Sequence, residues 1–509
     1  MPAIVLATLN ARYSHASMGL RCLRANLGEL RERSVLREFV IGDNPEQIVE
    51  RILADEPTIV GFGVYIWNLR QTEIVVAMLR ALRPELAIVI GGPEVSFGTE
   101  HTSLARDATT VICGEGETAF AECCRQALAG EALPAHIAAS SLDLAAIELP
   151  YAEYTDEDLA QRIIYVEASR GCPFTCEFCL SSIDEKVRGI EIERFLAAMD
   201  DLLKRGCRTF KFVDRTFNLK PSTCERILTF FLERWPRDAA GELIGPEHTK
   251  QVDLGADRNE SLFLHFEMVP DRLPENVKAL LDHFPPGAIQ FEVGIQSFTA
   301  IVGENIKRRM DVSATEANLA WLRQHGRVHV HADLIVGLPG ETPESFITSF
   351  DRLWDLRPHD IQVGILKLLP GTPLARHIEP YAMVFNREPP YDILASREFP
   401  FATMQRFKRF ARYTELFIND GRFTRGIACY VRHHPDGSPC RALLALSDFL
   451  WEATGQVHAL ALRRRYDLLL DALIAIGVDE HLAATELMAD FADTGHTKGG
   501  SERIRKLAS

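Results

Sequence analysis

The chain has 509 residues, only 11 cysteines and a formal net charge of −15 at pH 7. Sparse cysteines exclude a disulfide-stapled secreted domain, the acidic balance argues against a broad nucleic-acid footprint, and no apolar run reaches the ~18 residues that a membrane span needs. Because the opening residues MPAIVLATLN also lack the basic flank and cleavage pattern of a signal peptide, we expect a cytoplasmic protein of about two to four domains.

Residues 1–135 alternate short apolar runs with amphipathic stretches such as TEIVVAMLRALRP (72–84). Strand-like runs occur at 3–8, 35–41, 58–66, 86–92 and 109–116. This alternation predicts a doubly wound parallel α/β sheet, which binds its ligands at the carboxyl ends of the strands.

Four loops of this first region are rich in small residues: NARYSHASMG (10–19), GVYIWN (63–68), IGGPEVSFG (90–98) and CGEGETAF (113–120). Their glycines allow the main chain to approach a large ligand closely. A Rossmann nucleotide site is the obvious rival, but no G-x-G-x-x-G follows the first strand. Residues 136–160, which follow this region, are acidic and aperiodic and are predicted to be a linker over the surface.

The segment EASRGCPFTCEFCLSS (167–182) places Cys172, Cys176 and Cys179 within a few residues of one another. A structural zinc site uses four ligands, usually as two close pairs, and no second pair follows; Cys224 and His248 are isolated. Three thiolates suit a 4Fe–4S cube in which three irons are protein-bound and the fourth is open to a ligand. The spacing C-x3-C-x2-C therefore predicts an iron–sulfur cluster.

Residues 161–375 contain six strand–helix units. The strand-like runs are at 162–169, 209–214, 262–268, 288–297, 327–339 and 360–370. They predict a parallel sheet closed into a partial (β/α)6 barrel, with its reactive groups at the carboxyl ends of the strands. The cysteines lie in the loop after the first of these strands.

After residue 375 the pattern changes to long helical stretches, so residues 376–509 are predicted to form a mostly helical C-terminal domain. Within it, Cys429, His433, His434 and Cys440 could bind a metal, but a turn with exposed histidines is the alternative. The final run TKGGSERIRKLAS (497–509) is typical of a disordered basic tail.

Residues 160–375 resemble the radical S-adenosylmethionine (SAM) core, in which the open iron of the cluster chelates SAM. The resemblance rests on FVDRTFN, FEVGIQS, NIKRRMD, DLIVGLPGET and LLPGTPL, one motif after another along the strand ends. It implies that SAM is held by Asp214, Thr216, Asn218, Glu292, Gln296, Ser297, Arg308, Ile335 and Gly337. A structural alternative stays open for each: Asp214 or Asn218 could cap the next helix, Glu292 could pair with an arginine, and Gly337 could serve a turn.

The first region, fused ahead of such a core, resembles the cobalamin-binding domain of B12-dependent radical SAM enzymes, which have a helical C-terminal domain of unassigned function. The resemblance implies cobalamin contacts by His15, Tyr65, Ile66, Trp67, Asn68, Gly91, Gly92, Pro93, Glu94, Gly114, Glu115, Gly116 and Glu117. The loop RYSHASMG departs from D-x-H-x-x-G, since the acid is missing and the glycine is one residue late. His15 is therefore expected to be a loop histidine and not a cobalt ligand.

The family resemblance implies three cofactors: a 4Fe–4S cluster, SAM and cobalamin. It implies reductive cleavage of SAM to a 5′-deoxyadenosyl radical and methylation of an unactivated carbon of a small molecule through methylcobalamin. A radical rearrangement or cyclisation that uses cobalamin, and a non-catalytic cobalamin or redox sensor, are the alternatives. An external electron donor such as flavodoxin or ferredoxin is the expected partner, while membrane and bulk nucleic acid are not.

Overall fold

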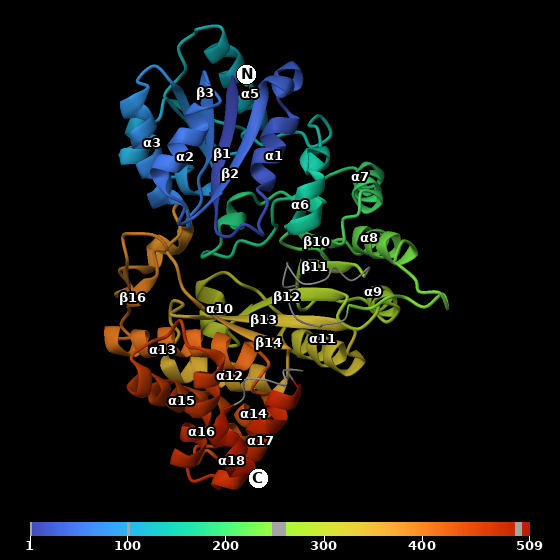
Figure 1. Ribbon diagram of the computed structural model, residues 1–509, viewed down its shortest axis with the longest axis vertical. Helices are drawn as coiled ribbons and strands as arrows, with labels where there is room; N and C mark the ends of the chain where they lie inside the picture. The colour runs from blue at the N-terminus through green and yellow to red at the C-terminus, as the bar shows by residue number, and fades with distance from the viewer. Residues whose placement is uncertain (1–2, 99–101, 247–260, 494–500) are drawn as a thin grey trace.

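The computed structural model describes residues 3–98, 102–246, 261–493 and 501–509. Two six-stranded parallel sheets and a bundle of C-terminal helices follow one another along the long axis of the molecule (Figure 1). The carboxyl ends of the first sheet face the second sheet. In the described parts of the chain, no helix is both long and apolar enough to span a bilayer.

The first sheet has the strand order β2-β1-β3-β4-β5-β6, and all its pairings are parallel. Helices α2, α3 and α4 cover one face and α1 and α5 the other, each over its own apolar core. The predicted doubly wound sheet is thus confirmed. Its elements are β1 (Ile4–Asn10), β2 (Ser34–Val40), β3 (Ile59–Gly63), β4 (Ala87–Gly91), β5 (Thr110–Cys113), β6 (His136–Ala138), α1 (Met18–Ala25), α2 (Pro45–Leu53), α3 (Leu69–Leu82), α4 (Ser103–Asp107) and α5 (Glu117–Leu128).

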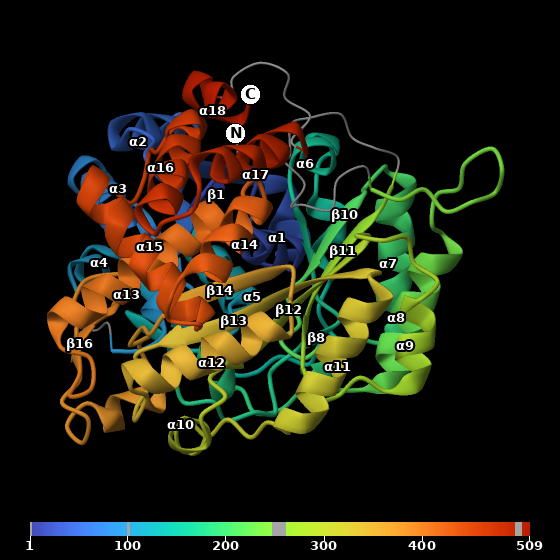
Figure 2. The same ribbon diagram turned by 90° about the horizontal axis from the view of Figure 1, so that it is seen from below.

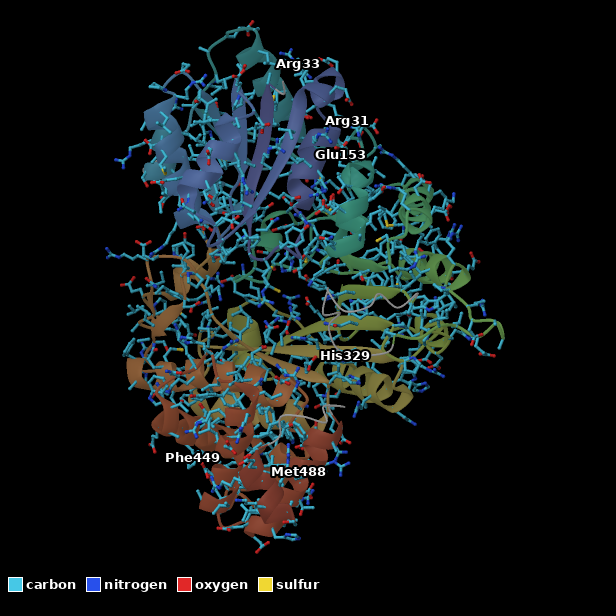
Figure 3. All side chains as sticks on the ribbon, viewed as in Figure 1. Arg31, Arg33, Glu153, His329, Phe449 and Met488 are labelled. Carbon is cyan, nitrogen blue, oxygen red and sulfur yellow. The ribbon has the colours of Figure 1, made fainter. Side chains whose placement is uncertain are left out.

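Residues 136–160 differ from the surface linker that the sequence suggests. They add the edge strand β6 to the first sheet and bury Tyr151 and Tyr154 in the main core before α6 (Asp156–Gln161) begins. The carboxylate of Glu153 binds Arg31 at 2.6 Å, and Figure 3 shows these two side chains close together. Burial of the two tyrosines makes this segment part of the joint between the sheets.

The second sheet has the order β14-β13-β12-β11-β10-β7, so neighbouring strands follow one another in the chain and the partial barrel stays open between β7 and β14. All six predicted barrel strands are confirmed. Figure 2 shows the helices along one side of this curved sheet. The elements are β7 (Ile164–Val166), β10 (Thr209–Phe212), β11 (Phe263–Met268), β12 (Ile289–Gln296), β13 (Val328–Val336), β14 (Asp360–Ile365), α7 (Ile192–Lys204), α8 (Pro221–Glu233), α9 (Glu275–Leu281), α10 (Ala300–Asn305), α11 (Val312–His325) and α12 (Pro343–Asp355).

The C-terminal helices share one core with the barrel. Phe346 and Phe350 of α12 meet Phe407 and Phe410 of α13 edge-on, with ring centroids 5.4 and 5.3 Å apart. The region comprises the hairpin β15 (Val384–Phe385) and β16 (Ile393–Ala395) and the helices α13 (Phe401–Tyr413), α14 (Thr424–His433), α15 (Pro439–Thr454), α16 (Leu462–Ala475), α17 (Glu480–Asp493) and α18 (Glu502–Ala508).

The prediction of a disordered tail is wrong for its described part. Residues 502–508 form α18, which contacts α17, and the side chain of Ile504 is buried in the core. The apolar positions Ile504 and Leu507 lie three residues apart, so they share a face of the helix although the segment is basic. Residues 494–500, which include the start of the predicted tail, lie outside the described residues.

Candidate functional site

The loop that carries the three cysteines leaves the sheet at the end of β7, between the short strands β8 (Ser169–Arg170) and β9 (Arg188–Gly189). Gly171 has φ +91°, and a Cβ there would stand 2.2 Å from the carbonyl oxygen of Lys186. Only glycine fits this close crossing. The backbone N–H of Cys172 then donates to the carbonyl of Asp184 at 2.9 Å, which fixes the start of the loop.

Cys172, Cys176 and Cys179 line one wall of a cavity of about 290 Å³ at the carboxyl ends of the barrel strands. Among the described residues, no three side chains of histidine, cysteine, aspartate or glutamate converge on a single metal ion. In a cube each thiolate holds a different iron, so the three sulfurs need not meet at one point. The donor set, three thiols and no fourth ligand, fits a 4Fe–4S cluster with one open iron.

Four predicted SAM residues line the same cavity: Thr216, Glu292, Gln296 and Arg308. The guanidinium of Arg308 donates to the carbonyl of Gly294, and its Nη1 lies 3.7 Å from Sγ of Cys176. Gln296 has a left-handed backbone, with φ +69°, and its buried Oε1 has no hydrogen-bond partner among the described residues. A strained residue with an unpaired buried oxygen is typical of a binding site.

Glu292 is paired, but with a histidine and a lysine and not with an arginine. Nε2 of His265 lies 2.9 Å and Nζ of Lys211 lies 3.5 Å from Oε1 of Glu292. Burial alone would raise the pKa of this carboxyl, yet the contact with His265 and the charge of Lys211 lower it to about 2. Glu292 is therefore ionised and can accept hydrogen bonds from a polar ligand.

Five predicted SAM residues lie outside the cavity lining: Asp214, Asn218, Ser297, Ile335 and Gly337. Asp214 accepts hydrogen bonds from the Ala168 amide (2.9 Å) and the Ser169 hydroxyl (2.6 Å), so it braces the strand that leads into the cysteine loop. Burial raises the pKa of this carboxyl to about 6, against the lowering effect of these hydrogen bonds.

Asn218 and Gly337 contact other parts of the fold and do not line the cavity. Asn218 does not cap α8, whose N-cap is Lys220; it exchanges hydrogen bonds with the backbone of Val269 at 2.7 and 2.9 Å. Gly337 has φ +90°, and a Cβ there would stand 3.0 Å from Met404 of α13. Gly337 thus allows the C-terminal helices to pack against the end of β13.

The cavity also contains charged residues that sequence reasoning missed. They are Arg215, Glu267, Asp271 and Arg309. For Glu267 the available signal was strand alternation, since it pairs with Glu292 of β12 and so faces inward as Glu292 does. Asp333, which belongs to the motif DLIVGLPGET, also lines the cavity, and burial raises its pKa to about 7, opposed by the nearby His331.

A second cavity, of about 320 Å³, lies in the first sheet beneath α1 and α5. Glycine is the most frequent residue of its wall, with seven members: Gly19, Gly61, Gly63, Gly91, Gly92, Gly114 and Gly116. At Gly61, Gly92 and Gly114 a Cβ would stand only 2.5, 2.5 and 2.6 Å from neighbouring atoms, so these positions have no room for a side chain. Such a narrow, mostly apolar slot fits the nucleotide tail of a cobalamin.

Seven predicted cobalamin residues line this slot: Tyr65, Gly91, Gly92, Gly114, Glu115, Gly116 and Glu117. His15, Ile66, Trp67, Asn68, Pro93 and Glu94 do not. His15 instead lies at the domain joint, where its Nδ1 is 2.6 Å from the hydroxyl of Tyr165 on β7. Burial lowers the pKa of His15, helped by the charge of Lys211.

The side chains beside the slot have structural partners. Asn68 is fully buried and donates to the carbonyls of Leu9 and Gly63, both at 3.1 Å, so it ties the ends of β1 and β3. Trp67 stacks on Tyr65 with ring centroids 4.6 Å apart and remains half-exposed. Cys22, Phe120 and Arg170 line the slot without having been predicted.

Arg170 connects the two cavities. Its guanidinium lies in the wall of the glycine-rich slot and contacts Glu117 at 2.7 Å and Glu167 at 2.8 Å. Two residues later, Cys172 lines the barrel cavity. Alongside, Arg188 binds Glu115 at 2.7 Å. Residues 114–117 (GEGE), which follow β5 of the first sheet, are therefore bound directly to the loop that carries the cysteines.

The C-terminal cysteines and histidines do not form a metal site in the structure. Cys429 and His433 lie on one face of α14, where Nδ1 of His433 contacts the carbonyl of Cys429 at 2.9 Å. Cys440 is at the start of α15, and its amide donates to Asp351. This part of the chain, like the other described ranges, contains no group of three potential ligands.

Three family models match successive parts of the chain: "B12 binding domain" over residues 4–124, "Radical SAM superfamily" over 166–353, and "Protein of unknown function (DUF4080)" over 379–506. The first two coincide with the glycine-rich slot and the cysteine-lined cavity. Residues 4–124 and 166–353 thus match the B12-binding and radical SAM families, in the domain order of cobalamin-dependent radical SAM enzymes, and the cofactors of these two families are a 4Fe–4S cluster, SAM and cobalamin.

Similar proteins include the cobalamin-dependent radical SAM methyltransferase TokK of Streptomyces tokunonensis, which is 25% identical over 362 residues, 64% of this chain and 50% of TokK. The chain spans about half the length of the curated relatives it matches first. The radical SAM methyltransferase TsrM of Kitasatospora setae, solved with cobalamin and a [4Fe-4S] cluster, has a TM-score of 0.59 at 16% identity, over 97% of this chain and 100% of that chain. The cobalamin-dependent SAM radical enzyme OxsB has a TM-score of 0.60 at 14% identity, over 100% of this chain and 83% of that chain. These two structures share the fold.

Proposed function

We propose that this protein is a cobalamin-dependent radical SAM methyltransferase that methylates an unactivated carbon of a small molecule. The observation that carries the proposal is the short connection between the two cavities through Arg170 and Cys172. A methyl carrier and a radical generator must both reach one substrate, so their sites must adjoin. The proposed division is a cobalamin-binding domain (1–135), a connecting segment (136–160), a radical SAM core (161–375) and a helical domain (376–509).

In this proposal Cys172, Cys176 and Cys179 hold the cluster, and the glycine-rich slot holds the tail of cobalamin. When bound, these cofactors and SAM supply one-electron reduction, radical generation and a transferable methyl group. The side chains of this protein position SAM. The guanidinium of Arg308 suits a carboxylate through its planar pair of donors, and the free oxygen of Gln296 and the ionised Glu292 offer acceptors to the hydroxyl or amine groups of SAM.

Two other functions are alternatives to methyl transfer. A cobalamin-using rearrangement or cyclisation would need the same two cavities, and OxsB is described as a radical enzyme and not as a methyltransferase. A non-catalytic sensor would have no use for the polar wall formed by Thr216, Glu292, Gln296 and Arg308. That wall favours an enzyme.

The test is product analysis of the anaerobic, reduced protein with SAM. We expect 5′-deoxyadenosine from any radical enzyme and S-adenosylhomocysteine in addition from a methyltransferase. Deoxyadenosine alone, with a natural substrate supplied, would indicate rearrangement, and neither product would indicate a sensor. An untargeted metabolite comparison between cells with and without the protein would supply substrate candidates. Flavodoxin or ferredoxin is the proposed electron donor for the reduction.

A further inference from the structure

Glu177 lies inside the cysteine loop, directly after Cys176, and its residue is fully buried. A lone carboxylate in such a place would be costly. Here Nζ of Lys307 lies 3.2 Å and Nη2 of Arg376 lies 2.6 Å from Oε1, while Nε2 of His377 lies 2.8 Å from Oε2. One buried acid therefore gathers three basic side chains from two other loops.

The main chain of Glu177 binds the same two loops. Its N–H donates to the carbonyl of Ile306 at 3.0 Å, and its carbonyl accepts from the N–H of Leu374 at 3.0 Å. Residues 306–307 follow α10, and residues 374–377 follow β14. Glu177 thus fixes the cysteine loop to both neighbours through backbone and side chain together.

The contact with Lys307 determines where the next residue goes. Lys307 has a left-handed backbone, with φ +53°, which is uncommon for a residue with a side chain. This turn directs Lys307 to Glu177 while the adjacent Arg308 reaches Cys176 and Gly294 within the cavity. Strain of this kind persists only where the surroundings hold it in place.

We propose that Glu177 is a positioning residue for SAM, which acts through Lys307 to hold Arg308 beside the cluster ligand Cys176. The inference rests on the proposed function, in which Arg308 binds the SAM carboxylate. A single buried carboxylate would then set the relative position of a cluster ligand and a SAM contact. Arg376 contacts the same carboxylate oxygen as Lys307, and His377 contacts the other oxygen.

The experiment measures SAM affinity, iron content and the electron paramagnetic resonance (EPR) spectrum of the reduced cluster in full-length protein. Glu177→Gln keeps the shape of the side chain and removes its charge. We expect retained iron, an altered response of the cluster signal to SAM, and SAM binding weakened roughly tenfold, which is near the low end of what the loss of one charge-assisted hydrogen bond costs. Glu193→Gln, at an exposed acid that pairs with Arg226, is the matched control and should bind SAM normally.

A double-mutant cycle tests the route through Arg308. If Glu177 acts through Arg308, Glu177→Gln should weaken SAM binding no further once Arg308→Ala is present. Equal weakening in both backgrounds, or wild-type affinity in Glu177→Gln alone, would overturn the inference. If Glu177→Gln fails to retain iron, Lys307→Gly decides the question, because glycine accepts the left-handed turn and removes the side chain that contacts Glu177. Weaker SAM binding in Lys307→Gly supports the inference, and unchanged binding refutes it.

The same cycle separates this inference from the proposed function. Wild-type SAM affinity in Arg308→Ala would refute the SAM site itself, and the role of Glu177 with it. Weakened binding in Arg308→Ala together with normal binding in Glu177→Gln would refute only the role of Glu177.

Discussion

The two cavities of this protein select their ligands by opposite means. The slot in the first sheet is lined mostly by glycines and apolar side chains, and its charges are confined to Glu115, Glu117 and Arg170. The barrel cavity has Gly294 as its single lining glycine and is lined by several charged residues, including Arg308 and Glu292. A bulky tail would be held mainly by shape, whereas the amino-acid end of SAM, which carries both an ammonium and a carboxylate, would be held by paired charges and hydrogen bonds.

Removal of the thiols should have the largest effect and should leave the slot untouched. The triple variant Cys172→Ala, Cys176→Ala and Cys179→Ala removes every ligand of the proposed cube, so we expect loss of the roughly four irons of a cube. Iron analysis and the brown absorbance of anaerobic protein measure this. Cobalamin binding should persist, and a triple variant that keeps its iron would contradict the cluster assignment.

Filling the slot should have the reverse effect. A Cβ at Gly91 would make only ordinary contacts, the nearest being 3.5 Å from the carbonyl of Ile112, so Gly91→Leu adds bulk to the slot without a backbone clash. We expect loss of cobalamin binding with iron retained, as measured by the absorbance of bound cobalamin. Ala475→Leu, at an exposed position of α16, is the control for added bulk. Normal cobalamin binding by Gly91→Leu would show that the tail lies elsewhere.

A smaller effect is expected on the free energy of unfolding, which should depend on pH through Glu341. This buried carboxyl does not line the barrel cavity. Burial raises the pKa of this carboxyl from its ordinary 4.5 to about 8. Between these values the unfolded chain ionises while the folded chain stays protonated, so the folded state loses stability as pH rises, at up to about 1.4 kcal/mol per pH unit.

Glu341→Gln removes this titration. The Tm of the wild type, relative to that of Glu341→Gln, should therefore fall from pH 5 to pH 8 and stay constant above pH 8. Parallel Tm curves across this range would mean that Glu341 is ionised in the fold.

The sequence predicted the sheets better than it predicted the sites. Apolar runs of five or more residues, such as 59–63 and 87–91, identified their strands because a fully buried strand is mostly apolar. The edge strand β6 was missed because its three residues are partly exposed, and a short edge strand carries no such pattern.

Site residues were predicted where a local motif carries them and missed where packing brings them together. The cysteines and Arg308 lie in motifs and line the cavity as expected. Cys22, Phe120 and Arg170 reach the slot from three separate elements, and no spacing in the chain reveals this. The loop sequence places His15 among the cobalamin residues, but its hydrogen-bond partner Tyr165 is 150 residues away in sequence.

The most direct test of two separate cofactor sites in one chain is EPR of anaerobic protein that contains both cobalt(II) and the reduced cluster. We expect both signals in the wild type, with only the cobalt signal lost in Gly91→Leu and only the cluster signal lost in the triple cysteine variant. The cobalt lines should lack the triplets that an axial nitrogen produces, and His15→Ala should leave them unchanged, because His15 contacts Tyr165 outside the slot. Simultaneous loss of both signals in either variant, or triplets that vanish in His15→Ala, would contradict this account.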